Sequence, residues 1–305
     1  MNVIGKKYIY LGFSGTMVLL SIVAIFYFGL KPGIDFAGGV AWELKFSEKP
    51  VAKEALSDAM VKEFKIPDAI VIPQGGNGQS FLIRAKDITE QQKGAALQGL
   101  QKKYGAVEEL QFQNIGPTVG NDLRQKAMIA FGLVLLGISL YVAFAFRKVS
   151  KPVSSWKYGI ITLLTLFHDA LIPAGMFVVL GYFLNVEVDT NFIVAILVVM
   201  GFSVHDTIVV FDRIRENLRV SFSGKSGNPA EDFNNLVNRS VNETMARSVN
   251  TSLTLVLTLL ALFFLGPTTL KYFILVILVG TIFGTYSSIF VASPLLTLWQ
   301  GKKKS

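Results

Sequence analysis

Two histidine–aspartate pairs stand inside long apolar stretches of this sequence. His205 and Asp206 lie in GFSVHDTIVVFDRIRENL, and His168 and Asp169 lie in LFHDALIPAG. An ionisable side chain within a membrane-spanning helix is costly unless it is paired or hydrated, so it indicates a functional site. The chemistry that these residue types allow there is the binding and release of protons.

Asp206 is the first candidate for a proton carrier. A carboxylate that alternates between a protonated state and an arginine-paired state has the properties that such a carrier needs. Arg247, at the start of the next apolar stretch, is the expected counter-charge. We therefore predict a relay of Asp206 and Arg247, with His205 as a further candidate. His168 and Asp169 fit a relay role and a structural link between helices equally well.

Polar and small residues of the apolar stretches fall on common faces when they are spaced as in a helix. Four stripes result: Thr162, Thr165 and Asp169; Ser203, Asp206, Thr207 and Val210; Arg247, Asn250, Thr251, Thr254 and Thr258; and Gly280, Gly284, Thr285 and Ser288. Small residues allow close approach of helices. The stripes together predict a hydrated seam between four helices, although single Ser and Thr residues in membrane helices are mostly packing contacts.

The composition is that of an integral membrane protein. Of 305 residues, 51% are hydrophobic and 16% charged, and the mean hydropathy is +0.50. A helix needs about 20 apolar residues to span a bilayer core of about 30 Å. Six stretches qualify: Tyr8–Leu30, Arg124–Phe146, Tyr158–Leu184, Phe192–Phe211, Ser248–Leu265 and Tyr272–Leu298. The predicted fold is a polytopic α-helical membrane protein with six transmembrane helices.

The net charge of +8 follows the membrane topology. Lys and Arg gather before the first helix, after the second and fourth, and in the tail 301–305, whereas the two short loops on the opposite side hold only Lys271. This positive-inside pattern predicts that both termini are cytoplasmic. It also accounts for the basic excess without a nucleic-acid partner.

No motif for nucleotide binding or nucleophilic catalysis occurs in the sequence. The chain has no cysteine, which excludes disulfides and thiolate metal sites. We expect no enzymatic activity, no cofactor and no metal, so any energy would come from an ion gradient.

Residues 31–120 interrupt the apolar pattern and are predicted to form a periplasmic domain. Strands are expected at Val40–Phe46, Ala69–Pro73, Ser80–Ala85 and Val107–Ile115, and helices at Pro50–Phe64 and Thr89–Tyr104, with Thr89 as N-cap. The order βαββαβ is typical of a ferredoxin-like α+β domain, a fold that hosts many functions.

The rest of the chain is predicted to serve the membrane. Residues 1–30 form the cytoplasmic N-terminus and first helix, and 121–300 form a five-helix membrane domain. Within that domain, 229–246 carries apolar residues on one helical face, which predicts an amphipathic segment on the inner membrane surface.

Several of these stretches resemble the motifs of the SecF family of bacterial protein export. GFSVHDTIVVFDRIRENL resembles the family's central signature, and GIDFAGG (Gly33–Gly39) and IGPTVG (Ile115–Gly120) resemble its FxGG and GPxxG elements. LFHDALIPAG, NRSVNETMARSVNTS and GTYSSIFVASPL resemble its later motifs, in the same order. One departure is His205, because the family pattern has Asn before the aspartate.

The resemblance implies one half-unit of the RND superfamily in the bacterial inner membrane. Such a chain pairs with SecD, acts beside the SecYEG channel, where a small accessory membrane protein such as YajC can join, and uses the proton-motive force to help translocating preproteins outward. It would contact membrane lipid and no nucleic acid. Asp206 and Arg247 match the family's relay aspartate and arginine. The motifs flanking the outer domain supply candidate hinge residues: Asp35, Phe36, Gly38, Gly39, Gly116, Pro117 and Gly120.

Two rival interpretations remain open at this point. One is an independent RND-type exporter of small molecules or lipids. The other is an intramembrane metalloenzyme that uses His168, Asp169, His205 and Asp206 as ligands, since imidazole and carboxylate can make a hard or borderline metal site.

Overall fold

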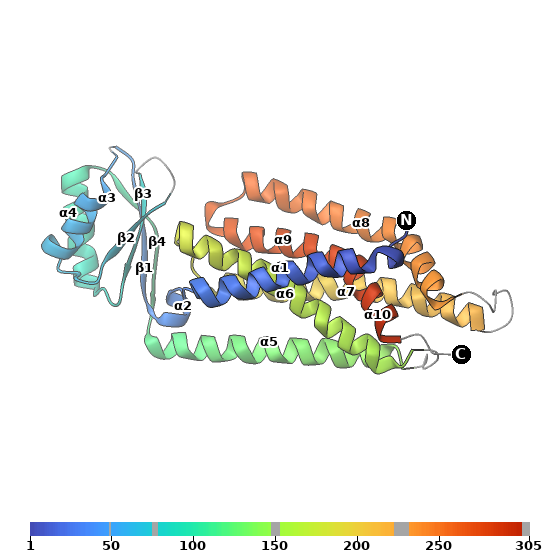
Figure 1. The fold of residues 1–305 in the computed structure, drawn as a ribbon. Helices are drawn as coiled ribbons and strands as arrows, with labels where there is room; N and C mark the ends of the chain where they lie inside the picture. The colour runs from blue at the N-terminus through green and yellow to red at the C-terminus, as the bar shows by residue number, and fades with distance from the viewer. Residues whose placement is uncertain (49, 75–78, 148–152, 223–231, 301–305) are drawn as a thin grey trace. The chain divides into compact units, whose positions relative to one another are not determined.

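The computed structural model describes all residues except 49, 75–78, 148–152, 223–231 and 301–305 (Figure 1). It consists of two compact units. One unit is Pro32–Met128, and the other combines Met1–Lys31 with Ile129–Ser305. The tail 301–305 and the beginning of the predicted amphipathic segment lie outside the described residues.

The larger unit is helical throughout its described part. Its elements are η1 (Ile4–Lys6), α1 (Lys7–Phe28), the greater part of α5 (Pro117–Ala145), α6 (Ser155–Leu184), α7 (Thr190–Phe222), α8 (Phe233–Leu265), η3 (Thr268–Leu270), α9 (Lys271–Ser287), η4 (Ser288–Ala292) and α10 (Ser293–Gln300). Counting α9, η4 and α10 as one span, the described residues contain six helices that are long and apolar enough to cross a membrane. The six predicted transmembrane helices are therefore confirmed.

Two helices begin or continue beyond their predicted ends. α5 starts at Pro117, seven residues before the predicted Arg124, because proline suits the first position of a helix, where its missing N–H is not needed. α7 runs on to Phe222 instead of stopping at Phe211.

α8 differs more from the expectation. From Phe233 onward the predicted amphipathic segment and the fifth transmembrane helix form one uninterrupted helix, because no Gly or Pro occurs before Leu265. Its apolar face packs on the end of α7 instead of standing alone. Asn217 of α7 donates to Ser240 Oγ at 2.9 Å and to Glu243 Oε2 at 2.8 Å.

An ion pair adds to this α7–α8 contact. Arg213 Nε of α7 donates to Glu243 Oε2 of α8 at 2.6 Å, and Arg213 Nη1 reaches Glu216 Oε2 at 2.6 Å. The ends of α7 and α8 are thus joined by charged and neutral hydrogen bonds together.

Glycines allow α9 and α6 to approach their neighbours closely. A Cβ on Gly284 of α9 would lie 3.1 Å from Ser203 Cβ of α7, and one on Gly280 would overlap Val199 of the same helix. On α6, a Cβ on Gly175 would overlap Ser21 of α1. The predicted small-residue face of the last membrane span, which begins with α9, is confirmed, and this face lies against α7.

The turn η1, which precedes α1, is held by α8. Asn238 Oδ1 accepts hydrogen bonds from the backbone N–H of Val3 at 2.8 Å and of Ile4 at 3.2 Å. N–H groups at a helix start have no partner within the helix, so Asn238 of α8 caps η1 from a neighbouring helix. Further along, Tyr286 Oη of α9 donates to the backbone oxygen of Tyr10 at 2.9 Å.

The last span changes its winding at η4, a π-helical turn. Pro294 follows it and cannot donate the backbone hydrogen bond that an α-helix would require there. π-turns of this kind occur frequently at functional sites.

The smaller unit has the predicted βαββαβ order. Its elements are α2 (Ile34–Ala37), β1 (Gly39–Phe46), α3 (Lys53–Asp58), η2 (Ala59–Glu63), β2 (Ile70–Gln74), β3 (Ser80–Ala85), α4 (Glu90–Tyr104) and β4 (Val107–Ile115). The sheet is antiparallel with the order β2-β3-β1-β4. The ferredoxin-like prediction is confirmed.

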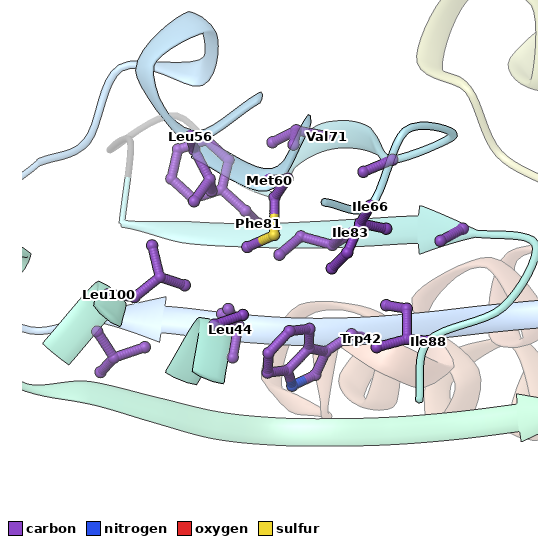
Figure 2. Packing of buried hydrophobic residues seen from close by; sticks show 14 of the residues in the cluster. Trp42, Leu44, Leu56, Met60, Ile66, Val71, Phe81, Ile83, Ile88 and Leu100 are labelled. Atoms are coloured by element: carbon purple, nitrogen blue, oxygen red, sulfur yellow. The ribbon is translucent and has the colours of Figure 1, made fainter. Parts of the chain in front are cut away.

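The core of this unit lies between the sheet and its helices (Figure 2). Alternate residues of β1 point into it, so Trp42 and Leu44 have no exposed surface, and neither do Met60 of η2 and Leu100 of α4. Thr89 caps α4 in a reciprocal capping box, as predicted.

Candidate functional site

Asp206 is buried in α7, with 5% of its side chain exposed. Its Oδ2 has no hydrogen-bond partner among the described residues. The Ser248 hydroxyl of α8 interacts with the Asp206 carboxylate. The two groups do not form a hydrogen bond, and Ser248 Oγ has no other hydrogen-bond partner in the described part of the chain. The candidate proton carrier is thus a buried carboxylate with a free acceptor site.

Arg247 acts on Asp206 electrostatically without forming an ion pair with it. The Arg247 side chain is exposed, whereas the next residue, Ser248, is buried. The counter-charge role of Arg247 therefore stays a prediction, and direct pairing would require the side chain to move toward Asp206.

The predicted stripe on α8 does not join the seam between the helices. Its members Arg247, Asn250, Thr251, Thr254 and Thr258 are exposed, and we call them the polar face of α8. The three threonine hydroxyls donate to carbonyls of their own helix. Sequence spacing selected the wrong side of α8, because the opposite side also carries hydroxyls, and it is this side, with Ser248 and Ser252, that is buried.

His205 is exposed, although Asp206 beside it is buried, and it interacts electrostatically with Asp206 as Arg247 does. Consecutive helical residues lie about 100° apart around the axis, so one side chain can face the bundle and the next its surroundings. Within the described ranges, no three His, Cys, Asp or Glu side chains lie close enough to hold a metal ion. The two histidine–aspartate pairs are therefore not gathered into one metal site.

Asp169 of α6 joins three helices. It has no exposed surface. Its Oδ1 lies 2.7 Å from His168 Nδ1, and its Oδ2 accepts hydrogen bonds from Ser287 of α9, at 2.7 Å, and from Ser203 of α7. We call these four residues the Asp169 cluster. It holds α6, α7 and α9 together at one level.

A second set of hydroxyl contacts lies beside the Asp169 cluster. Thr207 Oγ1 of α7 is 2.8 Å from Ser288 Oγ of η4, and Thr285 Oγ1 donates to Ser252 Oγ of α8 at 2.5 Å. A hydrogen-bonded seam therefore lies between α6, α7 and α9, and α8 reaches it through Ser252, whereas the hydration of the seam stays a prediction.

Two residues of the site were not selected from the sequence. The helical spacing in the sequence indicates Ser288 and not Ser287, and Arg247 and not Ser248. The signal in the sequence for Ser287 is its neighbour Ser288, the first residue of the π-turn, because both serines make contacts across helices, one to Asp169 and one to Thr207.

The two glycine motifs of the smaller unit pack against each other. Gly38 and Gly39 have φ of +75° and +119°, conformations that other residues rarely adopt. A Cβ on Gly38 would lie 2.9 Å from Pro117 Cα, and one on Gly120 would lie 3.0 Å from the Gly38 nitrogen. Phe36 belongs to the same contact region, because a Cβ on Gly120 would lie 3.2 Å from its carbonyl oxygen, whereas a Cβ on Gly116 would meet open space. Asp35 lies in α2, and the hinge role of all these residues remains a prediction.

Comparison with known proteins places this geometry in a family. The family model described as "Protein export membrane protein SecD/SecF, C-terminal" matches residues 96–302. The chain belongs to the SecD/SecF family. A SecF protein translocase subunit from Thermobaculum terrenum is 41% identical over 313 residues, which cover 99% of this chain and 95% of that relative.

Longer relatives combine this SecF-type chain with further sequence. The SecDF translocase subunit of Thermus thermophilus is 35% identical over 96% of this chain, which matches 38% of its own length. A crystal structure of SecDF from the same genus superposes with a TM-score of 0.82 at 33% identity, over 98% of this chain and 38% of that one. The SecF-type chain is thus a multi-pass membrane protein and a subunit of a Sec protein translocase, and it is related to chains in which SecD and SecF are joined.

Proposed function

We propose that this SecF-type chain works with SecD and uses the proton-motive force in a late stage of protein translocation through the SecYEG channel. The observation that carries the proposal is the Asp206 carboxylate, which is buried in a membrane-spanning helix and has an oxygen without a partner among the described residues. A buried carboxylate of this kind is stabilised by binding a proton. One charge that crosses about 100 mV releases about 2.3 kcal/mol, enough to bias a two-state equilibrium about fiftyfold.

In this proposal Asp206 binds and releases the proton, and Arg247 stabilises the carboxylate while it is charged. The exposed position of Arg247 and its electrostatic interaction with Asp206 support a charge that can approach and withdraw. His205 is exposed and interacts electrostatically with Asp206 as Arg247 does, so it is a further proposed member of the relay.

The polar face of α8 supports SecD as the partner. Its arginine, asparagine and threonines lie on a helix that is otherwise apolar enough to span a membrane. Lipid tails offer no hydrogen bonds to such residues, whereas polar side chains of another helix do. Because SecDF relatives contain this chain as 38% of their length, the SecD part is the proposed cover for this face.

The proposed location is the bacterial inner membrane, with both termini in the cytoplasm and the sheet domain in the periplasm. The distribution of Lys and Arg supports this orientation. The sheet domain would then meet the preprotein as it leaves the channel. A small accessory membrane protein such as YajC is a further proposed partner.

The test is export by cells or membrane vesicles that carry Asp206→Asn. We expect export to fall to the level of membranes that lack the chain, because asparagine cannot carry a proton, while SecD still co-purifies. The matched control is Asp122→Asn, the same chemical change at an exposed carboxylate that pairs with Lys126 at 2.8 Å. Normal export by Asp206→Asn would refute the proposal.

A further inference from the structure

The Asp169 cluster is a second buried carboxylate site that the proposed relay does not use. Ser203, one of its members, precedes Asp206 by three residues on α7, which is about one helical turn or about 4.5 Å along the axis. The cluster therefore contacts α7, the helix that carries the proposed proton carrier, about one helical turn from Asp206.

The two carboxylates have opposite surroundings. Asp206 Oδ2 has no hydrogen-bond partner among the described residues, so a proton can bind there. Both oxygens of Asp169 are occupied, one by His168 and the other by Ser203 and Ser287. A buried polar group whose hydrogen bonds are all satisfied makes the surrounding arrangement more rigid and more specific. That is the property of a structural link.

We propose that Asp169 is a positioning residue and not a second proton carrier: by accepting from Ser203 and Ser287 it fixes α7 and α9 in the register that places Asp206 opposite Ser248 of α8. This inference rests on the proposed role of Asp206 as the carrier. His168 holds the plane of the Asp169 carboxylate through its Nδ1, 2.7 Å from Oδ1.

The contacts around the cluster extend this register to the next turn. Thr207 of α7 contacts Ser288 at 2.8 Å, and Ser288 starts the π-turn η4. Gly284, one turn before Ser288, lies against Ser203. Asp169 thus acts at the centre of a continuous line of contact between α7 and the last span.

Asparagine and leucine at position 169 separate the two roles. The asparagine oxygen can accept from Ser203 and Ser287, and its amide can donate to His168 Nδ1 once the histidine proton lies on Nε2. Asn therefore preserves the three links, with the histidine proton on Nε2, which has no partner among the described residues, but Asn itself cannot carry a proton. Leucine has a similar size and preserves neither: the buried Ser203 hydroxyl loses its acceptor, and Ser287 keeps only the Gly284 carbonyl of its own helix, at 3.0 Å.

Export is the first readout, with SecD co-purification as the check on assembly. We expect the export rate of Asp169→Asn to lie within about twofold of the wild-type rate, with an unchanged pH dependence. The export rate of Asp169→Leu should be about tenfold lower, because this variant leaves buried polar groups unsatisfied. Loss of export by an assembled Asp169→Asn would overturn the proposal, because it would make Asp169 a proton carrier. Normal export by Asp169→Leu would overturn it as well. Where Asp169→Leu fails to assemble, the double variant Ser203→Ala/Ser287→Ala removes both donors, and it should show the same loss.

The register itself has a readout that does not depend on export. The chain has no cysteine, so Thr207→Cys and Ser288→Cys together report the contact between α7 and η4 by disulfide formation in native membranes. We expect the cross-link to persist with Asp169→Asn and to decrease severalfold with Asp169→Leu. An unchanged yield with Asp169→Leu refutes the positioning role. Normal export by Asp206→Asn refutes the proposed function instead, so the two failures are distinguishable.

Discussion

Replacing Gly280 by alanine would force α9 away from α7, the helix that carries Asp206. The new Cβ would lie 2.5 Å from Val199 Cγ1 and 2.9 Å from Val199 Cβ, closer than real Cβ atoms approach other atoms. Val199 is almost fully buried, and a β-branched side chain cannot turn its own Cβ aside. The helices must therefore separate.

The expected cost follows from two opposing effects. Overpacking of this kind destabilises a protein by about 1–3 kcal/mol, whereas alanine is favoured over glycine within a helix by about 1 kcal/mol. Gly201→Ala on α7 is the matched control, because a Cβ there would meet no atom within 4 Å. The difference in unfolding free energy between the two variants isolates the steric cost, which we expect to be about 1–3 kcal/mol.

The assay is unfolding of the purified protein in mild detergent, titrated with a denaturing detergent and followed by circular dichroism. A double-mutant cycle with Val199→Ala completes it, because the smaller side chain leaves room for the new methyl group. The coupling energy should be about 1–3 kcal/mol in the direction of rescue. If Gly280→Ala matches Gly201→Ala, or if the cycle is additive within about 0.5 kcal/mol, the close contact of α7 and α9 is refuted.

Three further changes test other parts of the fold. Thr89→Ala should destabilise the sheet domain by about 1 kcal/mol through loss of the cap, seen as faster hydrogen exchange in α4, and unchanged exchange there would contradict the capping box. Asn238→Ala should increase exchange at the amides of Val3 and Ile4 about fivefold or more, because both lose their acceptor; equal rates would show that another group caps η1. Burial raises the pKa of the Glu43 carboxyl above its ordinary value, so the charged carboxylate opposes folding. The free energy of unfolding of the sheet domain should therefore decrease as the pH rises from the ordinary carboxyl pKa to the raised one. Glu43→Gln should therefore protect β1 from exchange at neutral pH and lose this advantage in acid, and a constant difference across this range would refute the assignment.

The elements of this protein were largely predictable because they depend on local properties. A run of about 20 apolar residues spans a bilayer wherever it occurs, and the alternation in β1 identified its buried face. Thr89 was recognisable as a cap from its position before the helix. Asp206 was recognisable because a charge in an apolar run needs an explanation.

Contacts across helices were less predictable, since they depend on which face a helix presents. α8 carries hydroxyls on two faces, and only the bond from Thr285 to Ser252 shows which one is buried. Ser287 and Ser288 face different helices, and a period of 3.6 residues does not describe the π-turn that begins there. The packing of α8 against α7 depends on residues such as Asn217, which no local pattern records.

The length of α7 and α8 has a mechanical consequence. Each has 33 residues, about 50 Å at 1.5 Å per residue, against a hydrocarbon core of about 30 Å. Both helices therefore reach well beyond the bilayer, and the bond between Arg213 and Glu243 ties their projecting ends into a single stalk. α8 has no Gly or Pro along its length, and α7 has none after Gly201. A force on the stalk would therefore move α7 and α8 together, and with them Asp206 and Arg247.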